Sequence, residues 1–164
     1  PYRRQRQMCI RDRCLVAGAH AGTFRGNQLA MTAGSATIQY IKSHDLVENA
    51  EARGKQLATG LQGIQQNYPH IGDVRGRGLM LGVEIVDPEA ETDAQGNVRA
   101  HPTLASAIQK ECLRHGLIIE VGGRNSSVLR FLPPLVITDK EIIHVLEIFN
   151  VACSKALTSL LQPH

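Results

Sequence analysis

Residues 71–86 read IGDVRGRGLMLGVEIV, and this stretch decides the fold. It contains two short runs rich in Val, Ile and Leu, with Gly76 and Gly78 between them. Runs of this length and composition favour β-strands, and glycine between them favours a tight turn. The stretch therefore predicts a β-hairpin. Its repeated glycines, with Gly82 as the third, indicate close approach of another backbone or of a ligand.

Two helical patterns precede this hairpin. Asn27 is a suitable N-cap for a first helix that runs to about His44 and presents a face of small residues. A second, amphipathic helix runs from Asp45 to about Tyr68, with apolar residues in alternating steps of three and four. It begins at DLVE (45–48), which has the form of a capping box.

The chain after the hairpin continues to alternate between helices and strands. Its predicted elements are a polar loop (87–102), a helix (102–116), two strands (117–121 and 128–132) joined by a turn (122–127), and a long last helix. That helix begins at a second capping box, TDKE (138–141). Its predicted buried stripe is Ile142, Leu146, Phe149, Cys153, Ala156 and Leu160. The order of elements predicts an α+β domain, with a small, mostly antiparallel sheet covered on one face by helices.

Composition and charge narrow the functional classes. The chain has 164 residues, 43% hydrophobic and 20% charged, which is typical of one globular domain. Residues 1–13 contain five arginines and Asp12, a net charge of +4. The formal net charge of the whole chain is +3, so the remaining residues carry −1. We therefore expect no nucleic-acid partner. No apolar run reaches the length of a bilayer span and no signal peptide opens the chain, so we predict a soluble, cytoplasmic protein.

The cysteines and histidines form no recognisable reactive site. The four cysteines show no CxxC pair and no histidine at metal-ligand spacing, so we predict free thiols and no metal site. They are Cys9, Cys14, Cys112 and Cys153. None of the seven histidines stands beside a Ser or Cys in a nucleophile motif.

The turn HAGTFRGN (20–27) is a candidate anion site. The Thr23 hydroxyl and the N–H groups around Gly22 and Gly26 precede a helix N-terminus, where an anion is favoured. Spacing alone favours a simple helix entry, with Thr23 as a local capping hydroxyl, since the pattern matches neither a Walker loop nor a dinucleotide fingerprint.

Two groups of arginines are also candidates. Arg130, in SVLRFLPPL (127–135), interrupts an apolar strand, and its planar fork suits a carboxylate of a ligand or of the protein itself. Arg75 and Arg77 lie two residues apart and so project from one face of a strand, as binding groups or as a solvated edge.

Three stretches together carry a family resemblance: HAGTFRGNQLAMTAG (20–34), VRGRGLMLGVEIVDP (74–88) and GLIIEVGGRNSSVLRFLPPLVIT (116–138). In this order they resemble the C-terminal part of class III aminotransferases, which are pyridoxal 5'-phosphate enzymes of the aspartate-aminotransferase fold. The resemblance implies that residues 46–164 form the C-terminal small domain of that fold. Residues 17–45 would then be the cofactor-phosphate turn and a long interface helix from the end of a large domain, which is missing here. The arginine-rich leader, 1–16, is expected to be non-native or disordered.

The resemblance also implies roles for three residues. Gly22 and Thr23 would bind the cofactor phosphate in the neighbouring subunit of a homodimer. Arg130 would bind the α-carboxylate of the substrate. The Schiff-base lysine of the family lies upstream of the HAGTFRGN turn, and the chain's five lysines lack its context. We therefore expect no catalytic residue in this fragment and no activity from it alone. Those lysines are Lys42, Lys55, Lys110, Lys140 and Lys155.

The implied reaction of the full-length protein exchanges an amino group between L-2,4-diaminobutyrate and the 2-oxoglutarate/glutamate pair. Ornithine, 4-aminobutyrate and acetylornithine are alternative amino donors. A second class of function is also open, namely a non-catalytic α+β module that binds a small carboxylate through Arg130.

Overall fold

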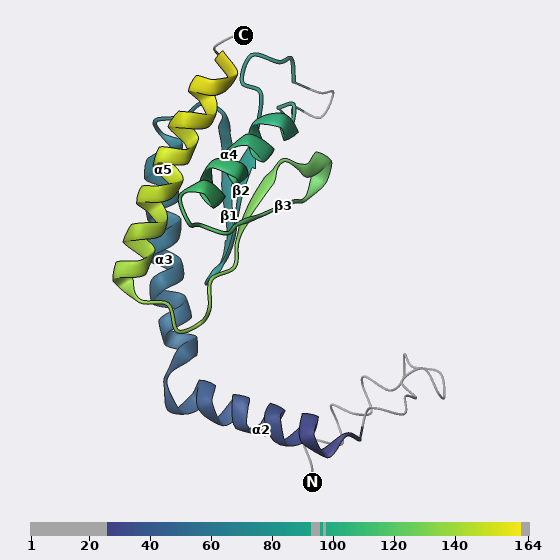
Figure 1. The fold of residues 1–164 in the computed structure, drawn as a ribbon, viewed down its shortest axis with the longest axis vertical. Helices are drawn as coiled ribbons and strands as arrows, with labels where there is room; N and C mark the ends of the chain where they lie inside the picture. The colour runs from purple at the N-terminus through teal and green to yellow at the C-terminus, as the bar shows by residue number, and fades with distance from the viewer. Residues whose placement is uncertain (1–25, 93–95, 97, 162–164) are drawn as a thin grey trace. The chain divides into compact units, whose positions relative to one another are not determined.

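The structure, a computed structural model, describes residues 26–92, 96 and 98–161 (Figure 1). It consists of two units, Pro1–Ser43 and His44–His164, each of which is described here by itself.

The described part of the first unit is the helix α2 (Gln28–Ser43). Asn27 caps it as predicted, because its Oδ1 accepts hydrogen bonds from the N–H groups of Leu29 (2.9 Å) and Ala30 (3.2 Å). No residue of α2 is buried. Its small-residue face is therefore not packed within the described unit.

The second unit begins with α3 (Leu46–Gln65), and the capping box predicted at its start is wrong. Asp45 has φ 49° and ψ 40°, a left-handed conformation, and its side chain makes no capping hydrogen bond. An N-cap side chain reaches the first amides of a helix from an extended backbone, which Asp45 does not have. The predicted apolar stripe of α3 is confirmed: its buried residues are Leu46, Gly54, Leu57, Leu61 and Ile64.

Four antiparallel strands form the sheet, in the spatial order β1-β2-β4-β3. They are β1 (Ile71–Arg77), β2 (Met80–Ile85), β3 (Glu120–Gly122) and β4 (Val128–Phe131). The predicted hairpin and the antiparallel sheet are thereby confirmed. The strand predicted at 117–121 is displaced, because residues 117–119 make other contacts: Leu117 N–H donates to Cys112 O, and Ile119 O accepts from Gln109 Nε2.

Glycines permit the close approach of backbone that the hairpin sequence indicated. Gly78, in the β1–β2 turn, has φ 54°, and its backbone lies against Gly54 of α3. A Cβ built at Gly54 would stand 2.6 Å from the Gly78 Cα and would overlap the Gly78 carbonyl group. The hairpin turn and the helix therefore pack backbone against backbone at this point.

Three helices, α3, α4 (Pro102–Arg114) and α5 (Asp139–Leu161), cover one face of the sheet (Figure 1). Along β2, alternate residues Leu81, Val83 and Ile85 point into this core, and the residues between them are more exposed. Gly116 (φ 85°) ends α4 as predicted, with the Leu117 N–H bonded to Cys112 O at 2.8 Å. Phe131 and Phe149 meet edge to face in the centre, with ring centroids 5.2 Å apart.

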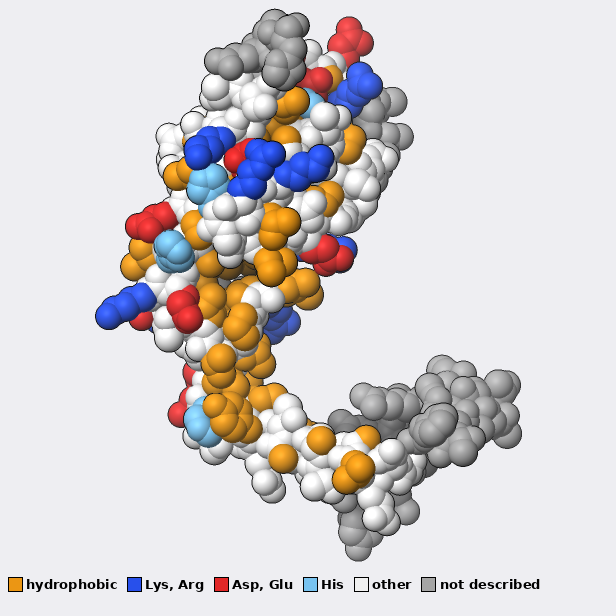
Figure 2. Space-filling model, in the orientation of Figure 1, with side chains coloured by type: hydrophobic (Ala, Val, Ile, Leu, Met, Phe, Trp, Pro, Cys, Tyr) orange, Lys and Arg blue, Asp and Glu red, His pale blue; other side chains and the backbone are white. Residues whose placement is uncertain are grey.

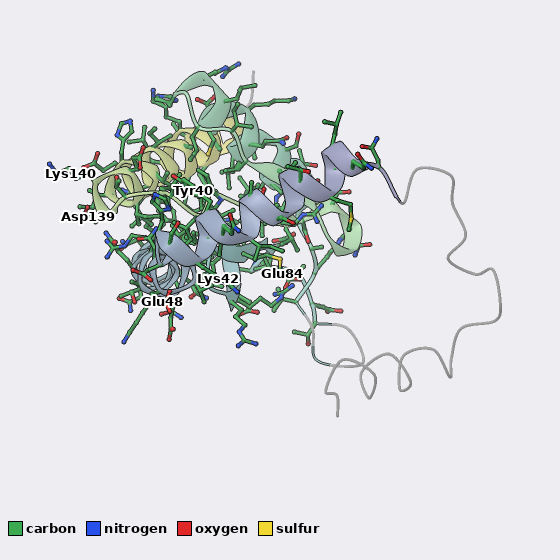
Figure 3. All side chains as sticks on the ribbon, turned by 90° about the horizontal axis from the view of Figure 1, so that it is seen from below. Tyr40, Lys42, Glu48, Glu84, Asp139 and Lys140 are labelled. Atoms are coloured by element: carbon green, nitrogen blue, oxygen red, sulfur yellow. The ribbon has the colours of Figure 1, made fainter. Side chains whose placement is uncertain are left out.

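The capping box predicted for α5 is confirmed. Glu141 Oε2 accepts from the Thr138 N–H (2.7 Å) and from the Thr138 hydroxyl (2.8 Å), while the Glu141 N–H donates to Thr138 Oγ1 (3.4 Å). Asp139 and Lys140, in the same turn, are exposed, as is Glu48 in the first turn of α3 (Figure 3).

Two expectations about the last helix need correction. Leu160 is 45% exposed, because the core ends near Ala156 and the helix continues past it. Contrary to the sequence prediction, α5 is long and apolar enough over Asp139–Leu160 to cross a membrane, by length and composition only. Length and composition do not distinguish a span from a core helix, and the buried face of α5 supplies Phe149, Ala152 and Cys153 to the core.

Candidate functional site

The face of the sheet opposite the helices carries the polar candidates. Arg130, on β4, is opposite Gly82 of β2 on one side and Glu120 of β3 on the other. Its Nη2 donates a hydrogen bond to Glu120 Oε1 at 2.9 Å, and the two side chains are 44% and 56% exposed. Half-exposed ion pairs are weak and exchange readily. The Arg130 guanidinium is therefore accessible to a carboxylate from outside the domain.

The guanidinium of Arg130 lies against Gly122, the last residue of β3. A Cβ built on Gly122 would stand 2.8 Å from Arg130 Cζ and 2.9 Å from Nε. Because glycine has no side chain, Gly122 leaves the space that the Arg130 guanidinium occupies. Sequence reasoning found Arg130 but missed both Glu120 and Gly122, because neither residue type stands out without the strand pairing.

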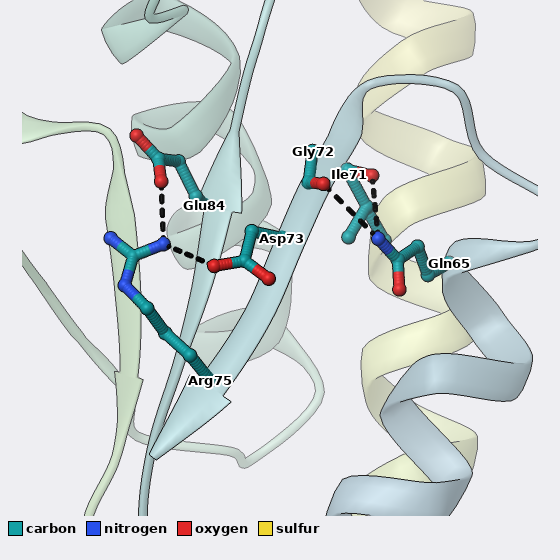
Figure 4. Close-up of polar contacts among 6 residues, drawn as sticks. All are labelled: Gln65, Ile71, Gly72, Asp73, Arg75 and Glu84. Atoms are coloured by element: carbon teal, nitrogen blue, oxygen red, sulfur yellow. Dashed lines mark hydrogen bonds and ion pairs between the residues drawn. The ribbon is translucent and has the colours of Figure 1, made fainter. Parts of the chain in front are cut away.

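Arg75, on β1, has a different environment on the same face (Figure 4). Its Nη1 contacts Asp73 Oδ2 at 2.8 Å and Glu84 Oε2 at 2.6 Å. Hydrogen bonds to Asp73 and then to Glu84 raise the pKa of Arg75 above its ordinary value. Two carboxylates thus already neutralise Arg75, so its local role is to join β1 to β2. Arg77 is exposed on the same face of the strand, as predicted.

Two hollows lie beside these strands. One, of about 250 Å³, borders the LPP segment after β4 and is apolar; its lining is Leu57, Leu117, Ile118, Ile119, Phe131, Leu132, Pro133, Pro134, Ile137, Ile142 and Val145. It offers no polar side chain to orient a substrate. The other, about 400 Å³, lies beside the hairpin turn and includes Glu51 and Arg77. Figure 2 shows further apolar side chains on the surface, and Ile118 is 85% exposed.

The proposed phosphate-binding residues Gly22 and Thr23 lie outside the described residues. The helix α2 follows this turn. Two of the first amides of α2, those of Leu29 and Ala30, already donate to Asn27. These two amides are engaged by the cap, and the roles of Gly22 and Thr23 stay predictions.

Two cysteines and one histidine of the described residues have structural roles. Cys112 and Cys153 are free and buried, as predicted, and burial raises the pKa of the Cys112 thiol to about 12. His101 caps α4, because its Nδ1 accepts from the Leu104 N–H at 3.2 Å. No cluster of potential metal ligands occurs in the described part of the chain.

A four-stranded antiparallel sheet with helices on one face and the accessible Arg130 on the other is a small α+β domain of the kind found in aminotransferases. The sequence profile of the class-III aminotransferases matches residues 8–153, and the chain belongs to this family. Members of the family use pyridoxal phosphate. Among its relatives, the diaminobutyrate–2-oxoglutarate aminotransferase of Rhizobium meliloti (strain 1021) is 56% identical over 128 residues, which is 78% of this chain and 27% of the relative.

A second curated relative and two solved structures are also aminotransferases. The diaminobutyrate–2-oxoglutarate aminotransferase of Haemophilus influenzae (strain ATCC 51907 / DSM 11121 / KW20 / Rd) is 42% identical, over 84% of this chain and 30% of its own length. A Bacillus anthracis aminotransferase structure aligns with TM-score 0.72 and 28% identity, over 83% of this chain and 30% of that one. The N-acetylornithine aminotransferase structure of Stenotrophomonas maltophilia K279a aligns with TM-score 0.67 and 28% identity, over 82% of this chain and 33% of that one. The chain thus spans under a third of the length of these two curated relatives.

Proposed function

We propose that the protein containing this chain is a pyridoxal-phosphate-dependent aminotransferase that exchanges an amino group between L-2,4-diaminobutyrate and the 2-oxoglutarate/glutamate pair. We further propose that it is a cytoplasmic homodimer. Residues 46–164 are its C-terminal small domain, and residues 17–45 belong to the end of a preceding large domain. The identity of 56% to a diaminobutyrate aminotransferase supports the choice of donor.

The observation that carries the proposal is the accessible guanidinium of Arg130. It projects from β4, which is paired with a strand on each side, and its one ion pair among the described residues is a half-exposed contact with Glu120. Both the amino donor and the 2-oxo acceptor bring a carboxylate, and the planar fork of arginine can bind one with two parallel hydrogen bonds. Arg130 therefore orients both substrates, while the bound cofactor supplies the electron-withdrawing chemistry.

The test uses Arg130→Ala and Arg130→Lys in the intact enzyme. Truncating one partner of a charge pair costs about 2–5 kcal/mol where the pair is buried, as the pair of Arg130 with a bound substrate carboxylate would be. We therefore expect kcat/KM for diaminobutyrate and for 2-oxoglutarate to fall together, with the cofactor retained. Lysine should restore little, because it lacks the planar fork. Arg75→Lys is the matched control on the same face. A lower melting temperature with unchanged kcat/KM of the folded enzyme would make Arg130 a structural residue instead.

Thr23 is the proposed cofactor contact. Its hydroxyl would donate to the cofactor phosphate across the subunit boundary, with Gly22 allowing close approach of the chain. Such a charge-assisted hydrogen bond is worth about 1.5–3 kcal/mol. Thr23→Ala should therefore release cofactor more readily on dialysis and weaken the dimer once the cofactor is removed. Retention equal to that of the wild type would leave the turn as a helix entry only.

A second donor has support as well. The acetylornithine aminotransferase of Synechocystis sp. (strain ATCC 27184 / PCC 6803 / Kazusa) is 39% identical over 82% of this chain. Assaying the intact enzyme on diaminobutyrate, acetylornithine, ornithine and 4-aminobutyrate distinguishes these donors by the ratio of their kcat/KM values.

A further inference from the structure

Lys155 of α5 and His115, the C-cap residue of α4, form a hydrogen-bonded pair at the surface. The Lys155 Nζ lies 3.0 Å from His115 Nε2. The other ring nitrogen, His115 Nδ1, lies 2.8 Å from the main-chain oxygen of Glu111. The backbone N–H of His115 donates to the same oxygen at 3.1 Å. The last turn of α4 therefore holds both the ring and the backbone of His115.

These contacts define the roles of the two ring nitrogens. A carbonyl oxygen only accepts hydrogen bonds, so His115 Nδ1 carries the hydrogen and donates it to Glu111 O. An ammonium group only donates, so His115 Nε2 offers its lone pair to Lys155 Nζ. His115 thus places a basic nitrogen against the terminal nitrogen of an exposed lysine. A base held beside a weak nucleophile is the arrangement that activates the nucleophile.

We propose that Lys155 is an acylation site, with His115 as its general base and an acyl phosphate as the acyl donor. The unprotonated amine of Lys155 attacks the carbonyl carbon of the acyl phosphate and forms a C–N bond. The C–O bond to the phosphate breaks, and the phosphate leaves with the electron pair of that bond. The proton that Nζ loses passes to His115 Nε2 and then to the phosphate. The products are an acyl-lysine and inorganic phosphate, and no oxidant or reductant takes part.

The charges around the pair favour an anionic reagent. Arg114 precedes His115 in the chain, and its side chain is 71% exposed. Lys110, one helical turn before Arg114, is also exposed. Glu111 is the one carboxylate in residues 110–115, and it pairs with Arg114. With Lys155, this end of α4 carries an excess of positive charge, which attracts the phosphate group of the reagent.

The experiment incubates the intact protein with acetyl phosphate and follows the acetylation of each lysine over time by mass spectrometry. Lys55, Lys110 and Lys140 are internal comparators, because they are exposed as Lys155 is. Lys110 also shares the positive end of α4, so it controls for attraction of the reagent. A positioned general base accelerates a reaction by about 100-fold or more, and an exposed pair should reach less, so we expect Lys155 to react roughly 10-fold faster than each comparator.

A substitution of the base tests the role of His115. In His115→Gln the glutamine oxygen can accept a hydrogen bond from Lys155 but cannot act as the base. The acetylation rate of Lys155 should therefore fall to that of the comparators, and a thermal melt checks that the fold is retained. His144→Gln is the matched control, because His144 is an exposed histidine of α5 that lies 3.5 Å from Glu147. It should leave the rate of Lys155 unchanged.

The outcomes decide the inference independently of the proposed function, because none of them measures transamination. A wild-type rate at Lys155 no higher than those of the comparators overturns the inference, and this comparison needs no variant. A preference for Lys155 that survives in a folded His115→Gln protein also overturns it, because His115 would then not be the base. A preference that is lost in His115→Gln and kept in His144→Gln supports it.

Discussion

Replacing Gly122 by alanine tests whether the position of the Arg130 guanidinium matters for function. The new Cβ would lie 2.8 Å from Cζ and 2.9 Å from Nε of Arg130. Non-bonded heavy atoms normally approach to about 3.5–4.0 Å, so the guanidinium must move by roughly 1 Å. Gly122 is not among the glycines with positive φ, so alanine brings no backbone strain. The perturbation falls on one flexible side chain.

A displacement of about 1 Å can cost on the order of 100-fold in rate. We therefore expect Gly122→Ala to lower kcat/KM for both carboxylate substrates of the intact enzyme about 10- to 100-fold. The free energy of unfolding should change by less than about 1 kcal/mol, because the overlapped group is a half-exposed side chain at the surface.

Steady-state kinetics on diaminobutyrate and 2-oxoglutarate and a thermal melt of the same preparation check both expectations. Gly63→Ala is the control, since a Cβ there would meet no atom within 4 Å. A Gly122→Ala enzyme with kcat/KM within twofold of the wild type would refute the reasoning, because Arg130 would then work equally well from another position.

Three further predictions concern stability and reactivity. Gly54→Ala should destabilise the protein by about 1–3 kcal/mol, since its Cβ would overlap the hairpin backbone. Gly63→Ala should stabilise it by about 0.5–1 kcal/mol, since its Cβ would meet no atom within 4 Å and alanine favours a helix over glycine. Urea denaturation measures both changes. Hydrogen bonds from the Thr138 N–H and then from its hydroxyl lower the pKa of Glu141 below its ordinary value. The stabilising effect of Glu141 is therefore fully present above that ordinary value and is lost as the pH falls through the lowered one. The stability deficit of Glu141→Gln should therefore shrink on acidification, and a deficit independent of pH would contradict this. Burial raises the pKa of Cys112 to about 12, so a thiol reagent at pH 8 should label it only after unfolding; rapid labelling of the folded protein would show that the core opens.

Local rules predicted most of the elements because their signals lie within a few residues of one another. The stripe of α3, the hairpin and the TDKE cap each depend on spacings of two to four positions, and each is confirmed. DLVE matches the same cap pattern as TDKE, yet the backbone at Asp45 turns left-handed. The pattern specifies side chains that can form a cap, but it does not fix the backbone angles of its first residue. In DLVE that residue is Asp45, and only the structure shows its conformation.

The limits of elements were harder to predict because they depend on contacts distant in sequence. Leu160 continues the helical period of α5, but the core no longer reaches it. Residues 117–119 have strand composition, yet the end of α4 supplies the partners that a neighbouring strand would otherwise provide. Periodicity predicts which face of an element is apolar, and tertiary packing decides how far that face is used.

The candidate site shows why a residue can be predicted while its partner is missed. Arg130 is conspicuous because it is charged within an apolar strand, which needs no knowledge of other strands. Identifying Glu120 requires the pairing register. A turn at 122–127 would pair Val121 with Val128, but the structure pairs Val121 with Leu129 and so brings Glu120 opposite Arg130. Because side chains alternate between faces, a register one residue different would move Glu120 off the position opposite Arg130. The five residues that connect β3 to β4 therefore decide whether a carboxylate stands beside the arginine, and with it which charged groups this face can recognise.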